Sequence, residues 1–146
     1  MKLKQVIFIV IVLIVICVVA AILYMNSNVS TLREYWKIII PKEDELIYTV
    51  DDFKSYPDTG ERYQVLKYTD EKNIENLKSN IEWVEPVDIL LEEEAISVIN
   101  TLGVDSEYYP DFTLEYIYYE HKKEDFGKLM MFYFLDENIL YIVENL

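Results

Sequence analysis

The sequence has almost none of the residues on which common catalytic devices depend. Its 146 residues include a single cysteine, Cys17, a single histidine, His121, and three glycines. A serine or cysteine nucleophile needs a histidine to relay its proton, and His121 lies in the run Glu-His-Lys-Lys-Glu-Asp, a composition typical of a solvated turn. One histidine does not make a Cys/His zinc site, and three glycines leave no glycine-rich phosphate loop. We therefore expect no catalytic residue, no metal site and no cofactor.

Basic residues are scarce as well. The chain has 13 lysines and arginines against 27 acidic residues, a net charge of −14. All the acidic residues and 11 of the 13 basic ones follow Met25, so this part of the chain carries −16. Nucleic-acid binding needs clustered lysines and arginines and is excluded. This negative charge would attract a basic protein or peptide, or it would only keep the domain soluble.

Charge is wholly absent from the twenty residues 6–25, which also lack glycine and proline. At ~1.5 Å per residue, such a helix is about 30 Å long, the thickness of the hydrocarbon core of a bilayer. The run predicts a transmembrane anchor over residues 6–25, after a cytoplasmic tail of residues 1–5. A cleaved signal peptide is the alternative, because Val19-Ala20-Ala21 would suit a signal peptidase.

The orientation of this anchor follows from the basic residues around it. Lys2 and Lys4 precede it, while Arg33 and Lys37 follow it within about 15 residues, so the local counts are nearly equal. A short basic N-terminus tends to stay cytoplasmic, and a long C-terminal domain is translocated regardless of its charge. We expect a single-pass protein of the cell membrane with its C-terminal domain outside.

Residues 26–41 predict a juxtamembrane helix. Thr31 and Glu34 form a capping box at its start, and Pro41 ends it. Apolar residues recur at helical spacing, namely Leu32, Tyr35, Trp36, Ile39 and Ile40. This apolar face either packs on the domain that follows or lies among lipid headgroups.

Residues 42–146 predict one acidic domain of the α+β class. The expected elements, in order, are strands at 46–50 and 63–68, helices at 70–81 and 88–102, and strands at 112–119, 129–135 and 139–143. This order indicates an antiparallel sheet with two or three helices packed on one face. The complete prediction of fold class is an N-terminal transmembrane helix followed by this α+β domain.

The candidate partner-binding residues fall into two groups, of which the first is acidic. Asp51, Asp52, Asp58 and Glu61 crowd the loop between the first two expected strands. Carboxylate oxygens of this kind hold Ca²⁺, but the alternating spacing of an EF-hand loop is missing. A solvated turn that is able to contact a partner is the interpretation that we prefer.

The second group is a set of tyrosines. Tyr116, Tyr118 and Tyr119 lie on the expected strand 112–119, where tyrosine is first a strand-forming and packing residue. Because Tyr116 and Tyr118 share a face opposite Tyr119, we expect at least one of them to be exposed. An exposed tyrosine on an acidic sheet would suit binding to a peptide or a glycan.

A family resemblance depends on three segments: Asp52–Tyr63 with its loop Pro-Asp-Thr-Gly-Glu, Trp83 after a short helix, and the closing strand Leu140–Glu144. Together they resemble small uncharacterised single-span exported proteins of Gram-positive bacteria, in which a Gly-Asp-Gly-Glu loop precedes an aromatic strand. Thr59 stands at one motif position here. The group has no known activity, so the resemblance implies an exported, anchored α+β domain and no chemistry.

Three functions follow as hypotheses. The first is a membrane-anchored, extracytoplasmic, non-enzymatic binding module for a protein, peptide or cell-envelope partner. The second is an immunity or inhibitor protein that neutralises a basic toxin or wall enzyme by charge complementarity. The third is a carboxylate-dependent hydrolase, which needs two facing acids in one pocket.

Overall fold

A computed structural model describes residues 10–19, 32–53, 59–85, 88–124 and 127–146 of the chain. The chain divides into two compact units, Met1–Ile40 and Pro41–Leu146. The predicted tail at residues 1–5 lies outside the described residues, and so do both ends of the predicted anchor at residues 6–25.

In the first unit, residues 10–19 form a helix whose apolar side chains are exposed. Among the described residues, no helix combines the length and the apolar character needed to cross a bilayer.

The structure differs from the helix predicted over residues 26–41. The part of this segment that is described contains one turn of π-helix, η1 (Leu32–Trp36), and no helix after it. Lys37 adopts a φ of 60°, which breaks a right-handed helix, and its Nζ donates to the carbonyl of Glu34 at 2.7 Å. The β-branched residues that follow, and then Pro41, also disfavour a helix.

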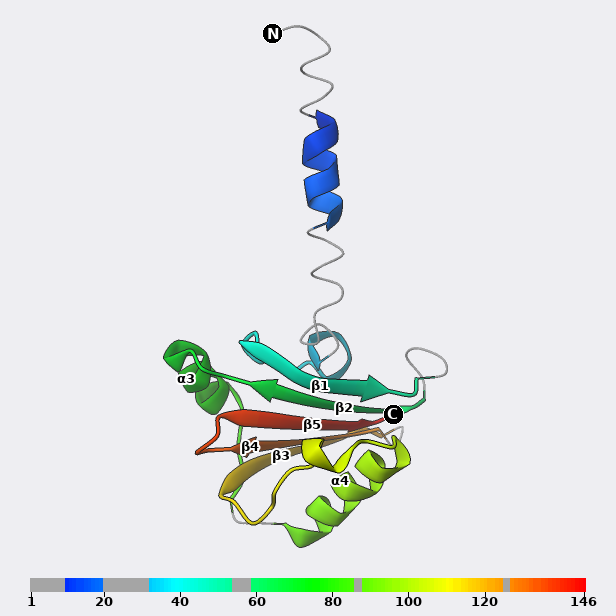
Figure 1. The fold of residues 1–146 in the computed structure, drawn as a ribbon, viewed down its shortest axis with the longest axis vertical. Helices are drawn as coiled ribbons and strands as arrows, with labels where there is room; N and C mark the ends of the chain where they lie inside the picture. The colour runs from blue at the N-terminus through cyan, green and yellow to red at the C-terminus, as the bar shows by residue number, and fades with distance from the viewer. Residues whose placement is uncertain (1–9, 20–31, 54–58, 86–87, 125–126) are drawn as a thin grey trace, which may run out of the picture. The chain divides into compact units, whose positions relative to one another are not determined.

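The second unit is built on a five-stranded antiparallel sheet with helices, as the α+β prediction required (Figure 1). The strands are β1 (Glu45–Asp51), β2 (Glu61–Lys67), β3 (Tyr116–Lys122), β4 (Lys128–Phe134) and β5 (Ile139–Asn145). Their order across the sheet is β1-β2-β5-β4-β3, and every neighbouring pair is antiparallel. The strand that comes last in the sequence, β5, therefore occupies the centre and joins the β1-β2 hairpin to the β3-β4 hairpin.

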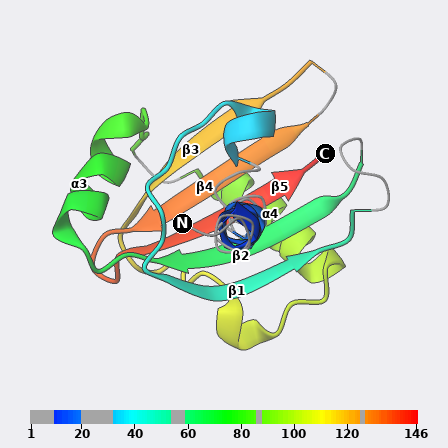
Figure 2. The same cartoon turned by 90° about the horizontal axis from the view of Figure 1, so that it is seen from above.

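Strands β4 and β5 consist mainly of apolar residues, and both of their faces are buried. One face packs against α4 (Ile89–Thr101), which crosses behind the sheet in Figure 2. The helix contributes a stripe of buried side chains to this core, namely Leu91, Ala95, Val98 and Ile99. Phe132 and Phe134 of β4 meet them from the sheet.

The other helix, α3 (Glu71–Asn80), does not share this face, so the prediction that the helices pack on one face is wrong for α3. Trp83 follows α3, and its ring centroid lies 6.0 Å from that of Tyr133. The Trp83 Nε1 donates to the carbonyl of Leu77 in α3 at 3.0 Å. Because side chains alternate along β4, Tyr133 points away from the face that α4 covers. Figure 1 and Figure 2 both show α3 beside the strand ends.

Both ends of α4 have ordinary capping residues. The Oδ1 of Asp88 accepts a hydrogen bond from the N–H of Leu90 at 3.1 Å, as an N-cap does. Gly103 adopts a φ of 67° and donates its N–H to the carbonyl of Asn100 at 3.0 Å. This is the left-handed residue with which many helices end. A short 3-10 helix, η2 (Ser106–Tyr108), follows on the way to β3.

Strand β3 begins later than the strand predicted at 112–119, and it ends later too. The Oδ1 of Asp111 accepts hydrogen bonds from the N–H and the Oγ1 of Thr113, at 3.1 and 2.6 Å, which fixes a turn in place of the expected strand. At the other end, His121 belongs to β3 and not to a solvated turn. Its Nδ1 lies 3.3 Å from the hydroxyl of Tyr119.

Candidate functional site

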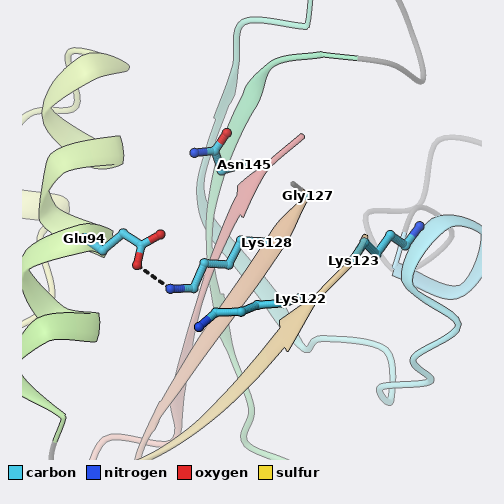
Figure 3. A pocket seen from close by; sticks show the side chains of 6 residues that line it. All are labelled: Glu94, Lys122, Lys123, Gly127, Lys128 and Asn145. Carbon is cyan, nitrogen blue, oxygen red and sulfur yellow. Dashed lines mark hydrogen bonds and ion pairs between the residues drawn. The ribbon is translucent and has the colours of Figure 1, made fainter. Parts of the chain in front are cut away.

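A hollow of about 380 Å³ opens between α4 and one end of the sheet (Figure 3). Its lining residues, which define what we call the lysine hollow, are Glu94, Lys122, Lys123, Gly127, Lys128 and Asn145. Half of them are lysines, although the chain as a whole is strongly acidic. This contrast makes the lysine hollow the strongest candidate site among the described residues.

The sheet register places three of these residues, Lys122, Lys128 and Asn145, on one face of the sheet. Lys122 of β3 pairs with Lys128 of β4, and Lys128 pairs with Asn145 of β5. Directly paired residues of antiparallel strands project to the same face. This is the face that α4 covers, because Met130, two positions after Lys128, lies in the core with α4. Glu94 of α4 consequently points at Lys128, as Figure 3 shows.

Lys128 is the centre of a cluster of ion pairs. Its Nζ lies 2.7 Å from the Oε1 of Glu120 and also contacts the Oε2 of Glu94. The Nζ of Lys122 lies 3.0 Å from the same oxygen of Glu120. The side chain of Lys128 is 12% exposed, whereas that of Lys122 is 66% exposed. Lys128 therefore holds the cluster together, and Lys122 presents its charge to solvent.

The local chemistry keeps the two central groups of this cluster charged. Burial lowers the pKa of Lys128, but hydrogen bonds with Glu120 and Glu94 outweigh burial and leave that pKa above its ordinary value. Burial likewise raises the pKa of Glu120, and hydrogen bonds from Lys128 and Lys122 reverse this and leave it below its ordinary value. A lysine that stays protonated at neutral pH serves neither as a nucleophile nor as a general base. The arrangement suits the recognition of charge.

The first loop predicted as a site lies at the same end of the sheet. Glu61 pairs with Asn145 across β2 and β5, so it continues the row of Lys122 and Lys128. The Oδ1 of Asp52 accepts a hydrogen bond from the N–H of Glu61 at 2.7 Å. Burial, and then the charge of Asp52, raises the pKa of Glu61. The structure thus brings two of the four predicted acids together, close to the lysine hollow.

The remaining two acids are placed differently. Asp51 is the last residue of β1 and is exposed, while Asp58 lies outside the described residues. Among the residues that the structure describes, no three histidines, cysteines or carboxylates are grouped so that they would hold a metal ion.

The three predicted tyrosines lie on β3, an edge strand of the sheet that β5 and β4 separate from the β1-β2 hairpin. Tyr116 is 6% exposed, and its hydroxyl donates to Glu92 of α4. Tyr118 and Tyr119 are half-buried, on opposite faces of the strand. The expectation that at least one of them is exposed is wrong, because α4 and the segment before it lie against this strand.

Sequence reasoning did not single out the lysines. Lys122 and Lys128 flank the charged turn between β3 and β4, and a hairpin register with these two residues paired would have placed them on one face. Glu94 is one of three consecutive glutamates near the start of α4, where carboxylates favour a helix. Its ion pair with Lys128 depends on how α4 packs over the sheet, and no local sequence pattern encodes this packing.

Glu94 is the single carboxylate among the described lining residues of the lysine hollow, and Glu120 meets it at Lys128. No protein-family model, no curated protein and no solved structure matches this chain. The resemblance to exported Gram-positive proteins therefore stays a prediction.

Proposed function

We propose that this chain is a membrane-anchored, non-enzymatic binding module that holds an acidic α+β domain outside the cell membrane. In this proposal the residues 6–25 anchor the chain, and the folded unit Pro41–Leu146 meets a protein, peptide or envelope partner.

The observation that carries the proposal is the helix at residues 10–19. Its large apolar side chains, on all sides of the helix, are between 40% and 57% exposed. A helix that is apolar all round is stable only when it is surrounded by protein or lipid. The uncharged run continues on both sides of this helix, to twenty residues in total, which is the length that a bilayer requires.

The geometry of the lysine hollow supports binding over catalysis. Lys128 is held between Glu120 and Glu94 and stays protonated. An ion-pair cluster of this kind fixes charges in place, and fixed charges of both signs favour one orientation of a charged partner. A catalytic acid or base would need the opposite, a group poised to exchange its proton near the working pH.

Cysteine accessibility in intact cells tests the proposed location. Ser106 is exposed on the acidic domain, and Ser106→Cys in a Cys17→Ser background gives one reactive thiol. We expect labelling by a membrane-impermeant maleimide on a chain of full length. Labelling on a shortened chain would mean that the anchor is cleaved, and labelling only after lysis would place the domain in the cytoplasm.

Two matched variants make this readout unambiguous. Lys4→Cys, on the other side of the uncharged run, should react only after lysis if residues 6–25 span the membrane. Ile142→Cys, which is fully buried in the centre of the sheet, should react only after denaturation. Equal labelling of Lys4→Cys and Ser106→Cys in intact cells would contradict the proposal.

A further inference from the structure

The first turn of α4 presents apolar side chains to solvent. Ile89 and Leu90 are 64% and 77% exposed, the highest values among the large apolar side chains described in Pro41–Leu146. Leu90 does not belong to the buried stripe of the helix. It lies on the outer stripe with Glu93 and Ser97, at i+3 and i+7, and both of these are exposed polar residues.

A third exposed apolar residue lies close by. Val84 is 42% exposed and forms a two-way backbone bridge with Tyr118 of β3, at 2.8 and 3.2 Å. Tyr116, two residues earlier in β3, donates its hydroxyl to Glu92 in the second turn of α4. Two residues of a strand span about 6.6 Å. Val84 and α4 are thus both attached to β3, at Tyr118 and at Tyr116, and we name Val84, Ile89 and Leu90 the entry patch.

Carboxylates neighbour the residues of the entry patch along the chain. Glu85 is adjacent to Val84 in the sequence, Asp88 caps α4, and Glu93 follows Leu90 on its outer stripe. Glu85 and Glu93 are exposed, and neither forms an ion pair within the described part of the chain. An apolar centre with a charged rim is the composition of a protein interface.

We propose that the entry patch binds a basic amphipathic segment of a partner protein, with an apolar residue seated on Leu90 and Ile89 and lysines or arginines facing the rim. This inference deepens the proposed function, on which it rests for the existence of a partner. A second copy of the chain would bring the same carboxylates against Glu85 and Glu93, and an anionic bilayer would be repelled by them. A segment that has both positive charges and an apolar residue complements the carboxylates as well as the apolar side chains of the entry patch.

A model peptide tests the proposal with the full chain in non-ionic detergent. The probe is a fluorescent peptide of about 18 residues, made of lysine, alanine and leucine, with its leucines on one helical face. Its fluorescence anisotropy is titrated against the chain, and empty micelles provide the blank. We expect saturable binding that Leu90→Ser weakens about tenfold, as the loss of one buried leucine does.

Control variants separate the patch from general acidity. Ile39→Ser removes a side chain of similar exposure, 59%, in the other unit, and Glu75→Gln removes an exposed carboxylate of α3. Both should bind the probe like the unchanged chain, whereas Glu93→Gln should bind it more weakly and with a smaller loss at about 0.5 M salt. Circular dichroism confirms that each variant is folded.

Several results would overturn the proposal. The first is equal binding by Leu90→Ser and the unchanged chain, and the second is equal binding of a scrambled peptide with the same composition. Failure of the unchanged chain to bind the probe would also overturn the proposal. Self-association that Leu90→Ser abolishes would assign the patch to a second copy. None of these outcomes bears on the thiol-labelling result, so failure of the inference and failure of the proposed location are distinguishable.

Discussion

The guanidinium of Arg62 lies between the carboxylate of Glu144 and the ring of Phe53. Arg62 and Glu144 are direct partners across β2 and β5, and their Nη1 and Oε2 atoms are 3.4 Å apart. The Cζ of Arg62 is 4.5 Å from the centroid of the Phe53 ring. The side chain of Glu144 is fully buried and that of Arg62 is 12% exposed. This ion pair is therefore buried near one end of β2 and β5, where the loss of one partner costs more than it would at a surface.

Removing Arg62 alone should destabilise the domain strongly. We expect Arg62→Leu to lower the free energy of unfolding by about 3–5 kcal/mol, because it leaves the carboxylate of Glu144 buried without this cation. The double variant Arg62→Leu/Glu144→Leu should recover most of the loss, since two apolar residues replace a buried ion pair at little cost. Urea denaturation of the full chain in non-ionic detergent measures both. A double variant as unstable as the single one would contradict this account of the pair.

The two glycines with positive φ should respond differently to alanine. A Cβ at Gly60, where φ is 145°, would lie 2.5 Å from the Cδ1 and 2.9 Å from the Cα of Phe53. A Cβ at Gly103, where φ is 67°, meets nothing within 4 Å. We expect Gly60→Ala to lower the free energy of unfolding by about 2–4 kcal/mol, from overpacking and strain together. Gly103→Ala should lose about 1–2 kcal/mol from strain alone, and thermal denaturation of the two variants side by side would show the order.

Glu61→Gln should stabilise the domain at neutral pH. Burial and the charge of Asp52 raise the pKa of Glu61 above its ordinary value of 4.5, so ionising this group is harder in the folded than in the unfolded chain. The folded state therefore loses stability as the pH rises through that pKa. We expect a higher free energy of unfolding than that of the unchanged chain near pH 7, and no difference near about pH 3.

The matched control for this pH dependence is Glu75→Gln, which replaces an exposed carboxylate in α3. It should leave the denaturation midpoint nearly unchanged at both pH values. A gain for Glu61→Gln that is equal at pH 3 and pH 7 would show that the effect comes from packing and not from charge.

Tyr63→Phe isolates one buried hydrogen bond. The ring of Tyr63 is fully buried, and its hydroxyl donates to the carbonyl of Tyr108 at 2.5 Å. Burial, with the neighbouring tyrosines, raises the pKa of the Tyr63 phenol, so it remains a neutral donor at all working pH values. We expect a loss of about 1 kcal/mol in the free energy of unfolding. Tyr109→Phe removes an exposed hydroxyl bond to Asn100 and should cost less, and a reversed order would contradict this interpretation.

Local patterns in the sequence were sufficient to predict the elements of the domain. The order of two strands, two helices and three strands is confirmed. The N-cap Asp88 and the left-handed Gly103 mark α4 because both act within one turn of the chain. The start of β3 was predicted too early. The carboxylate of Asp111 accepts local hydrogen bonds from Thr113, and these favour a turn over a strand there.

Long-range relationships were not predictable in this way. The sequence does not say that α3 and α4 use different faces of the sheet, because hydrophobic periodicity gives the width of an apolar face and not its partner. The lysine hollow depends on the register of three strands and on the position of α4, which together place Glu94 beside Lys128. The α+β class of the domain was therefore predictable from the sequence, and the candidate site was not.

The central position of β5 has a consequence for how the protein is made. A ribosome releases β1 to β4 before residues 139–145, so during synthesis the two hairpins exist without the strand that unites them. An isolated two-stranded hairpin is marginally stable at best. The five-stranded sheet is therefore complete, and its core is closed, only after β5 has joined the two hairpins.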